Sequence, residues 1–183
     1  MHKFLISLVF FLFLTPYSFC QVILEKQNRV ENIDPGFCSW CCLESLGKHH
    51  KIEALHDLTH KRYLEWLKEP SVWINSSQEP RNTGTSMSVS MKLKSLGVKF
   101  TYQDHYNYDK TLLKRAIKDK LGCSIVVKQW WKDKTIGHHS ILLLDYNEKG
   151  IEFFDPNDID HIYTATLGWF DQYWTGYTLI LEK

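Results

Sequence analysis

The sequence predicts a single α+β domain, in which N-terminal helices pack on a C-terminal antiparallel sheet. Apolar residues recur at helical spacing as far as residue 121, and β-rich runs separated by turns follow from Cys123 onward. Helices followed by strands are typical of the α+β class. The chain has 183 residues, of which 44% are hydrophobic and 23% charged, so it fits one globular domain and excludes a disordered or fibrous protein.

The N-terminal half is predicted to be mainly helical. The first helix covers 39–47, where apolar residues repeat on one face and Gly47 ends the helix. Asp109 is a suitable N-cap for the last helix, and Gly122 follows its end. Residues 69–85 are expected to form a loop, because proline, asparagine, serine and glycine punctuate them. The other predicted helices are 52–67, 86–96 and 110–121.

The strands are predicted from runs rich in valine, isoleucine, leucine and phenylalanine. A short strand over 98–102 follows the third helix, and the others lie after the last helix. Their predicted ranges are 123–129, 140–146, 151–154 and 177–181. The Asn-Glu-Lys-Gly segment at 147–150 turns a hairpin between two of them.

Residues 1–20 are predicted to be a secretory signal peptide, which leaves 21–183 as the folded domain. A cationic start precedes an apolar run over 4–14, and Cys20 is small enough to precede cleavage before Gln21. The run is too short to cross a bilayer of about 30 Å as a helix. Acylation of Cys20 and an uncleaved anchor are the alternatives, although Phe19 is bulky where a lipoprotein signal has a small residue. We expect the mature protein to be secreted or periplasmic, without a membrane span.

Charge argues against two classes of partner. The chain carries 22 basic and 21 acidic side chains, a formal net charge of +1. A nucleic-acid-binding or anionic-membrane-binding protein usually has a strong basic excess, so neither partner is expected. Aromatic residues make up 14% of the chain, which supports a substantial core. The sequence does not indicate an oligomeric state.

A cluster of cysteines contains the first candidate for a reactive residue. Cys38 follows a Pro-Gly turn and opens the first predicted helix, where backbone N–H groups and the helix dipole favour a thiolate and can hold an oxyanion. Cys41 and Cys42 fall inside that helix and read as packing residues. A disulfide from either of them to Cys123 stays open. The spacing supports zinc only weakly, because no second Cys-x-x-Cys or His pair accompanies it.

The β-rich half contains a candidate general base, a histidine, together with residues that could orient it. His139 is expected to open a hydrophobic strand at the edge of a cleft. The hairpin that follows returns Asp155 and Asn157 to the start of that strand, where either could orient the imidazole. His138 is the alternative to His139.

In this order the motifs resemble those of the papain-like cysteine peptidases. The closest resemblance is to the bacteriocin-processing, double-glycine-leader type. Gly36-x-Cys38 is similar to its nucleophile turn, and His139-Ser140-Ile141-Leu142-Leu143 followed by Asp155-Pro156 is similar to its histidine strand and Asp-Pro pair. Where the family has a glutamine before the nucleophile, this chain has Asn32.

The resemblance implies a papain-like fold and a peptidase that acts on a peptide or protein without a metal or organic cofactor. It implies Cys38 as nucleophile, His139 as general base and acid, and Asp155 as the residue that orients His139. Asn32 would help the Cys38 backbone N–H to hold the oxyanion. Two alternatives stay open: a thiol amidase or acyltransferase on the same fold, and a non-catalytic binding module with Cys38 in a disulfide.

Overall fold

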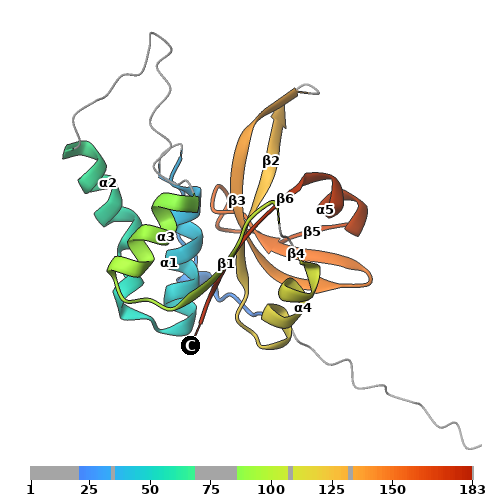
Figure 1. Cartoon of the computed structure of the whole chain (residues 1–183), viewed down its shortest axis with the longest axis horizontal. Helices are drawn as coiled ribbons and strands as arrows, with labels where there is room; N and C mark the ends of the chain where they lie inside the picture. Colours follow the sequence, from blue (N-terminus) through green and yellow to red (C-terminus); the bar gives the residue numbers. More distant parts are fainter. Residues whose placement is uncertain (1–20, 34–35, 69–85, 107–108, 132–133, 183) are drawn as a thin grey trace, which may run out of the picture.

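A computed structural model describes residues 21–33, 36–68, 86–106, 109–131 and 134–182. The predicted signal peptide and the predicted loop at 69–85 lie outside these residues. Helices α1 to α3 gather on one side of the molecule, and the sheet with α4 and α5 forms the other (Figure 1). The α-helices are α1 (Cys38–His50), α2 (Leu58–Lys68), α3 (Ser86–Ser95), α4 (Lys110–Lys118) and α5 (Leu167–Tyr173). Short 3-10 turns are η1 (Lys26–Asn28) and η2 (Glu53–Leu55).

The sheet has six strands in the order β1-β6-β2-β3-β4-β5, all paired antiparallel. The strands are β1 (Phe100–Gln103), β2 (Cys123–Trp131), β3 (Lys134–Asn147), β4 (Gly150–Phe154), β5 (Tyr163–Ala165) and β6 (Trp174–Leu181). Strand β1 leaves the helical half and pairs with the last strand, so that Phe100 lies opposite Leu181. The α+β class is confirmed, with one departure from the predicted order of elements: the short helix α5 lies among the strands, between β5 and β6.

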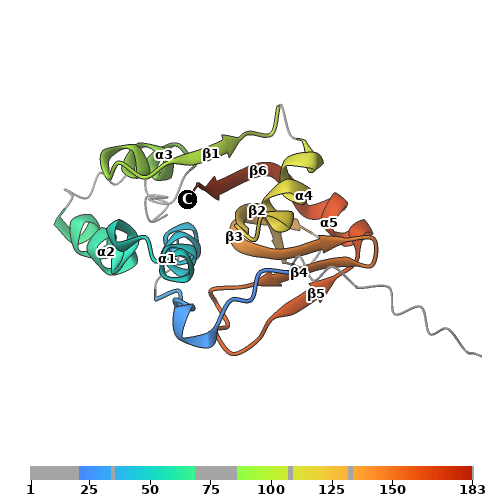
Figure 2. The same ribbon diagram turned by 90° about the horizontal axis from the view of Figure 1, so that it is seen from below.

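Helix α1 is the central element of the core. It lies between α2 and the sheet (Figure 2), and Trp40, Cys42 and Leu46 are completely buried. The prediction that Gly47 ends this helix is wrong, because α1 continues to His50. Gly47 has a packing role instead: a Cβ there would lie 2.4 Å from Leu55 Cβ of the turn η2.

The segment predicted as one helix over 52–67 is divided in two. The turn η2 and helix α2 are separated at Asp57, whose φ of 57° lies in the left-handed region. Glu44 of α1 caps α2, because its carboxylate accepts a 2.8 Å hydrogen bond from the backbone N–H of Thr59. Lys48 pairs with the same carboxylate at 3.0 Å, so the buried charge of Glu44 is compensated.

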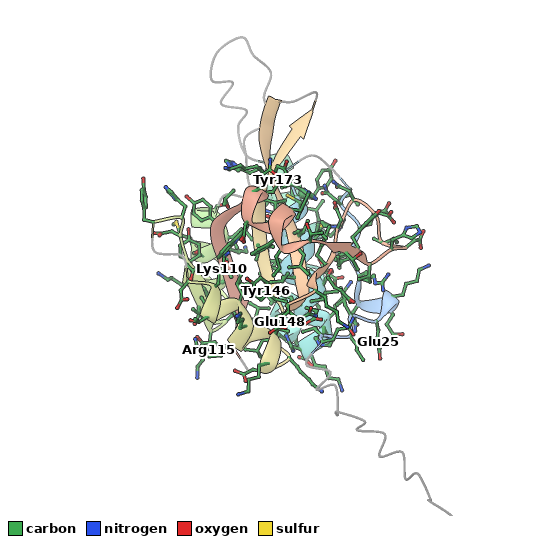
Figure 3. All side chains as sticks on the ribbon, turned by 90° about the vertical axis from the view of Figure 1, so that its right-hand side faces the viewer. Glu25, Lys110, Arg115, Tyr146, Glu148 and Tyr173 are labelled. Carbon is green, nitrogen blue, oxygen red and sulfur yellow. The ribbon has the colours of Figure 1, made fainter. Side chains whose placement is uncertain are left out.

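Helices α4 and α5 lie on the opposite side of the sheet from α1, and they face the viewer in Figure 3. Asp109 caps α4 as predicted by accepting a hydrogen bond from Thr111 N–H, although the helix ends at Lys118, three residues before the expected 121. Helix α5 and strand β5 were not predicted. Thr166 caps α5, and the fully buried Phe170 packs edge-on against Tyr146 of β3.

The β3–β4 hairpin returns the chain toward the start of the sheet's core. It turns at Asn147–Gly150, as predicted. Gly150 has a φ of 146°, and a Cβ there would lie 2.2 Å from the carbonyl oxygen of Ala165 in β5, so only glycine fits. The next residues after β4 are Asp155 and Pro156, which therefore come back beside the middle of β3. Among the residues that the structure describes, no helix is both long and apolar enough to cross a bilayer.

Candidate active site

Cys38 is the first residue of α1, at the positive end of the helix dipole. Gly36, two residues earlier, has a φ of 94°, which the turn into the helix requires and a side chain would strain. The sulfur accepts a hydrogen bond from the backbone N–H of Ser140 at 3.4 Å. Because Ser140 directly follows His139, this contact brings the start of α1 to the histidine on β3.

His139 is buried, with 9% of its surface exposed, and its ring lies between Cys38 and Asp155. Nε2 lies 2.8 Å from Asp155 Oδ1. Nδ1 is then the ring nitrogen left for the sulfur, with which His139 interacts by hydrogen bonding and charge. The imidazole is therefore held by a carboxylate on one side and faces a thiol on the other.

The electrostatics of this site favour a thiolate and an imidazolium. Burial raises the pKa of the Cys38 thiol, but the hydrogen bond and charge of His139, with the backbone N–H and the hydroxyl of Ser140, lower that pKa below its ordinary value. Burial likewise lowers the pKa of His139, but the hydrogen bond to Asp155, helped by Cys38, raises that pKa to about 9. Each charge stabilises the other, so the pair titrates as a unit.

The other cysteines have the opposite character. Burial raises the pKa of Cys41 to about 12 and holds the pKa values of Cys42 and Cys123 well above their ordinary range. All three thiols are buried, and none of the four cysteines in the described chain forms a disulfide. Cys38 is thus the one described thiol that combines partial exposure with a lowered pKa.

Asn157 contacts both Asp155 and His139, and Asn32 is hydrogen-bonded to Asn157. Asn157 donates its backbone N–H to Asp155 Oδ1 at 2.8 Å, and its side-chain amide lies 3.5 Å from His139 Nε2. Asn157 Oδ1 accepts a 2.8 Å hydrogen bond from Asn32 Nδ2. The described hydrogen bonds of Asn32 thus reach Asn157, Pro156 and Cys41. One of its two amide hydrogens is used by Asn157, and none of these described hydrogen bonds reaches Cys38.

The two neighbouring histidines differ in their exposure. His138 is exposed and His139 buried, as expected for successive residues of a strand, whose side chains point to opposite faces. The expectation that His139 opens its strand is wrong: β3 begins at Lys134, because β2 and β3 pair beyond the sheet as a long hairpin. His139 lies opposite Val127 within this ladder.

A small pocket lies beside the site, between α1 and the sheet. Ser39 and Ser140, the residues directly after Cys38 and His139, line it together with Tyr102 and Tyr177. Its lining mixes hydroxyl groups with apolar surface, which suits a peptide with its backbone amides and side chains. The described residues hold no group of three or more side chains suited to a metal ion.

Ser39 and Ser140 were not among the predicted site residues. Their hydroxyl oxygens are 2.6 Å apart in the buried layer between α1 and β3. A signal for Ser140 was present, since it is a polar residue directly before the apolar run Ile141–Leu144. A partner for it 101 residues away is visible only in the folded chain.

The fold is similar to that of solved double-glycine protease domains. One is a double glycine motif protease from an AMS/PCAT transporter, solved with its leader peptide. It is 15% identical, with a TM-score of 0.57, and the match covers 88% of this chain and 92% of that one. Another is the peptidase domain of Streptococcus ComA, a bifunctional ABC transporter of a quorum-sensing pathway. It is 18% identical, with a TM-score of 0.54, and the match covers 83% and 95%.

No family model and no curated protein matches the sequence. At 15% and 18% identity the two matches establish similarity of the fold alone. They bear out the resemblance drawn from the Cys38, His139 and Asp-Pro motifs. The chain has the papain-like fold of double-glycine cysteine protease domains.

Proposed function

We propose that this chain is a secreted cysteine peptidase that hydrolyses peptide bonds, with Cys38 as nucleophile, His139 as general base and acid, and Asp155 as the group that orients His139. One observation carries the proposal. Asp155 binds His139 Nε2 at 2.8 Å, while the residue after His139 donates its N–H to Cys38 Sγ at 3.4 Å. These two contacts connect the proposed nucleophile, base and orienting group, and such a connection supports activation of the thiol.

The chemistry follows from the charges at rest. The Cys38 thiolate attacks the carbonyl carbon of the substrate, and the oxygen becomes an oxyanion. His139, protonated at Nδ1, gives its proton to the leaving amine as the C–N bond breaks. The neutral imidazole then takes a proton from water, which attacks the acyl-cysteine bond and releases the second product. Asp155 keeps Nε2 bound throughout, so that Nδ1 stays directed at the reaction.

Two groups are available to stabilise the oxyanion. The backbone N–H of Cys38 lies at the N-terminus of α1, where helix N–H groups have no intrahelical acceptor. Asn32 is the second, provided that the amide hydrogen not used by Asn157 turns toward the substrate. Asn32 is one methylene shorter than the glutamine of the family, so its backbone must lie closer to the substrate to reach it.

A peptide or protein substrate agrees with the pocket beside the site, because its lining combines hydroxyl groups with apolar side chains. The AMS/PCAT protease was solved with a leader peptide, which agrees with a peptide substrate. Export is proposed from residues 1–20, and intact-mass analysis of the exported protein tests it. A chain beginning near Gln21 is expected, whereas a retained Met1 or a lipid on Cys20 would contradict simple cleavage.

The activity is tested with the purified chain from Gln21 and a mass-spectrometric screen of a proteome-derived peptide library. The wild-type protein should generate new peptide termini, and Cys38→Ala should generate none above background. Cys123→Ala is the matched control, because this thiol is also replaced by alanine but lies buried at the start of β2. Cleavage that persists in Cys38→Ala would contradict the proposal, as would a well-folded wild-type protein that cleaves nothing.

Two further outcomes identify the alternatives. Incorporation of a labelled amine into substrate glutamine or acyl groups in place of hydrolysis would make the chain an acyltransferase on the same fold. Peptide binding without cleavage, with Cys38 found in a disulfide, would make it a binding module. The structure has Cys38 as a free thiol, which favours an enzyme over the module.

A further inference from the structure

Ser140 is bound to helix α1 through all three of its polar groups. Its backbone N–H donates to Cys38 Sγ at 3.4 Å, and its hydroxyl lies 2.6 Å from the Ser39 hydroxyl. Its carbonyl oxygen accepts a hydrogen bond from the Cys42 thiol at 3.4 Å. Ser140 is only 2% exposed, so water does not compete with these contacts.

These contacts join the two elements that carry the reactive groups. Cys38 begins α1 and His139 precedes Ser140 on β3, and about a hundred residues separate them in the chain, so local backbone geometry does not set their distance. The surrounding core is apolar, and apolar packing is non-directional. Hydrogen bonds are directional, so the Ser140 contacts fix which part of β3 lies against the first turn of α1.

We infer that Ser140 is a positioning residue of this site: its bond to Ser39 holds β3 against α1 so that the Ser140 N–H and the His139 ring both face the Cys38 sulfur. The inference rests on the proposed function and adds to it a residue outside the nucleophile, base and orienting group. Ser39 is the partner that makes the bond, and Cys42 adds a weaker thiol contact from the next turn of α1.

The consequence for Cys38 is electrostatic. An N–H donor to a thiolate favours the charged form, as does a nearby imidazolium. The titratable groups that face Cys38 are His139 from β3 and Cys41 and Cys42 from its own helix. Near pH 6 only His139 among these three is charged, since both thiols remain protonated. Loss of the Ser39–Ser140 bond should therefore show itself in the titration of Cys38.

The test is the pH dependence of Cys38 alkylation by iodoacetamide in the full chain from Gln21, followed by peptide mapping. In Ser140→Ala and in Ser39→Ala we expect the alkylation midpoint to move upward, so that labelling at pH 6 slows by about 3- to 10-fold. The double variant should be no slower than Ser140→Ala alone, because the Ser39–Ser140 bond is already lost in that variant.

Two controls separate positioning from simple loss of stability. Ser45→Ala removes another buried hydroxyl of α1, which bonds to Cys41 O and Val30 N, and it should leave the midpoint unchanged. Ser140→Thr and Ser140→Val have the same shape but differ in the hydroxyl, so the threonine variant should label faster than the valine variant.

The outcomes are distinguishable from those of the proposed function, because alkylation needs no substrate. An unchanged midpoint in folded Ser39→Ala and Ser140→Ala overturns the inference, even when the wild type cleaves peptides. Additive effects in the double variant, or an equal shift in Ser45→Ala, also overturn it. If the midpoint shifts in a protein that hydrolyses no peptide, Ser140 still positions Cys38, but the proposed peptidase activity is rejected.

Discussion

The imidazole of His139 and the carboxylate of Asp155 are joined at 2.8 Å across the β3–β4 hairpin. The two residues meet because a single tight turn at Asn147–Gly150 returns β4 beside β3. Asp155 Oδ1 also accepts the backbone N–H of Asn157 at 2.8 Å, which holds the carboxylate in place. A rigid hairpin thus sets the orientation of the base on which the proposed chemistry depends.

Loss of Asp155 should impair turnover strongly. We expect Asp155→Ala to lower kcat by about 100-fold, because His139 loses both its orientation and the charge that stabilises its imidazolium. Asp155→Asn should retain the geometry better than alanine but lack the charge, so its alkaline limb should move to lower pH. Asn157→Ala is the comparison, and a larger loss there than in Asp155→Ala would transfer the orienting role to Asn157.

The wild-type enzyme should be active over a broad neutral range. The pKa of Cys38 is lowered, so the thiolate is lost only as pH falls through this lowered value. The pKa of His139 is raised to about 9, so the imidazolium persists below that pH and is lost above it. A profile of kcat/KM between pH 4 and pH 10 should therefore fall at both ends, with the alkaline fall near pH 9. A profile that only begins to rise above pH 8.5 would indicate an unactivated thiol.

Asn32 can be tested separately from the thiol. If its amide stabilises the oxyanion, Asn32→Ala should lower kcat by about 100-fold yet leave alkylation of Cys38 unchanged, because alkylation forms no oxyanion. Asn157→Ala removes the partner of Asn32 at 2.8 Å. Equal effects of the two single variants and of the double variant would mean that Asn32 acts only by supporting Asn157 behind the histidine.

Gly47 should be intolerant of a side chain. A Cβ at this position lies 2.4 Å from Leu55 Cβ, so Gly47→Ala forces η2 away from α1 and should cost about 1–3 kcal/mol in the free energy of unfolding. The matched control is Gly168→Ala in α5, where the nearest atom is 3.8 Å away and alanine favours the helix. Urea unfolding of both variants measures the difference, and equal stability would contradict the close packing.

The residues of the candidate site could be proposed from the sequence because their patterns are local. A cysteine after a glycine turn, a histidine before an apolar run and an Asp-Pro pair one hairpin later are short patterns, and the hairpin itself has a recognisable turn. Asp109 capped its helix for the same reason, since its partner Thr111 is two residues away. Each of these depends on neighbours in the sequence.

The features that were missed depend on distant neighbours. Gly47 reads as a helix stop, but the left-handed Lys51 ends the helix and Leu55 requires the glycine. Strand β5 has only three residues, and it exists because it pairs with β4 at the edge of the sheet. Ser140 looks like an ordinary strand residue until α1 packs against it. Tertiary contacts decide such positions, and local pattern does not contain them.

Selective alkylation shows whether His139 activates the Cys38 thiol, on which the proposed chemistry depends. The reduced protein is treated with limiting iodoacetamide at pH 6, and each cysteine is quantified by peptide mapping. We expect Cys38 to label first, because its pKa is lowered while burial raises the pKa values of Cys41, Cys42 and Cys123. His139→Ala should abolish most of this selectivity. Labelling of Cys38 no faster than the other three, or unchanged labelling in His139→Ala, would contradict the account.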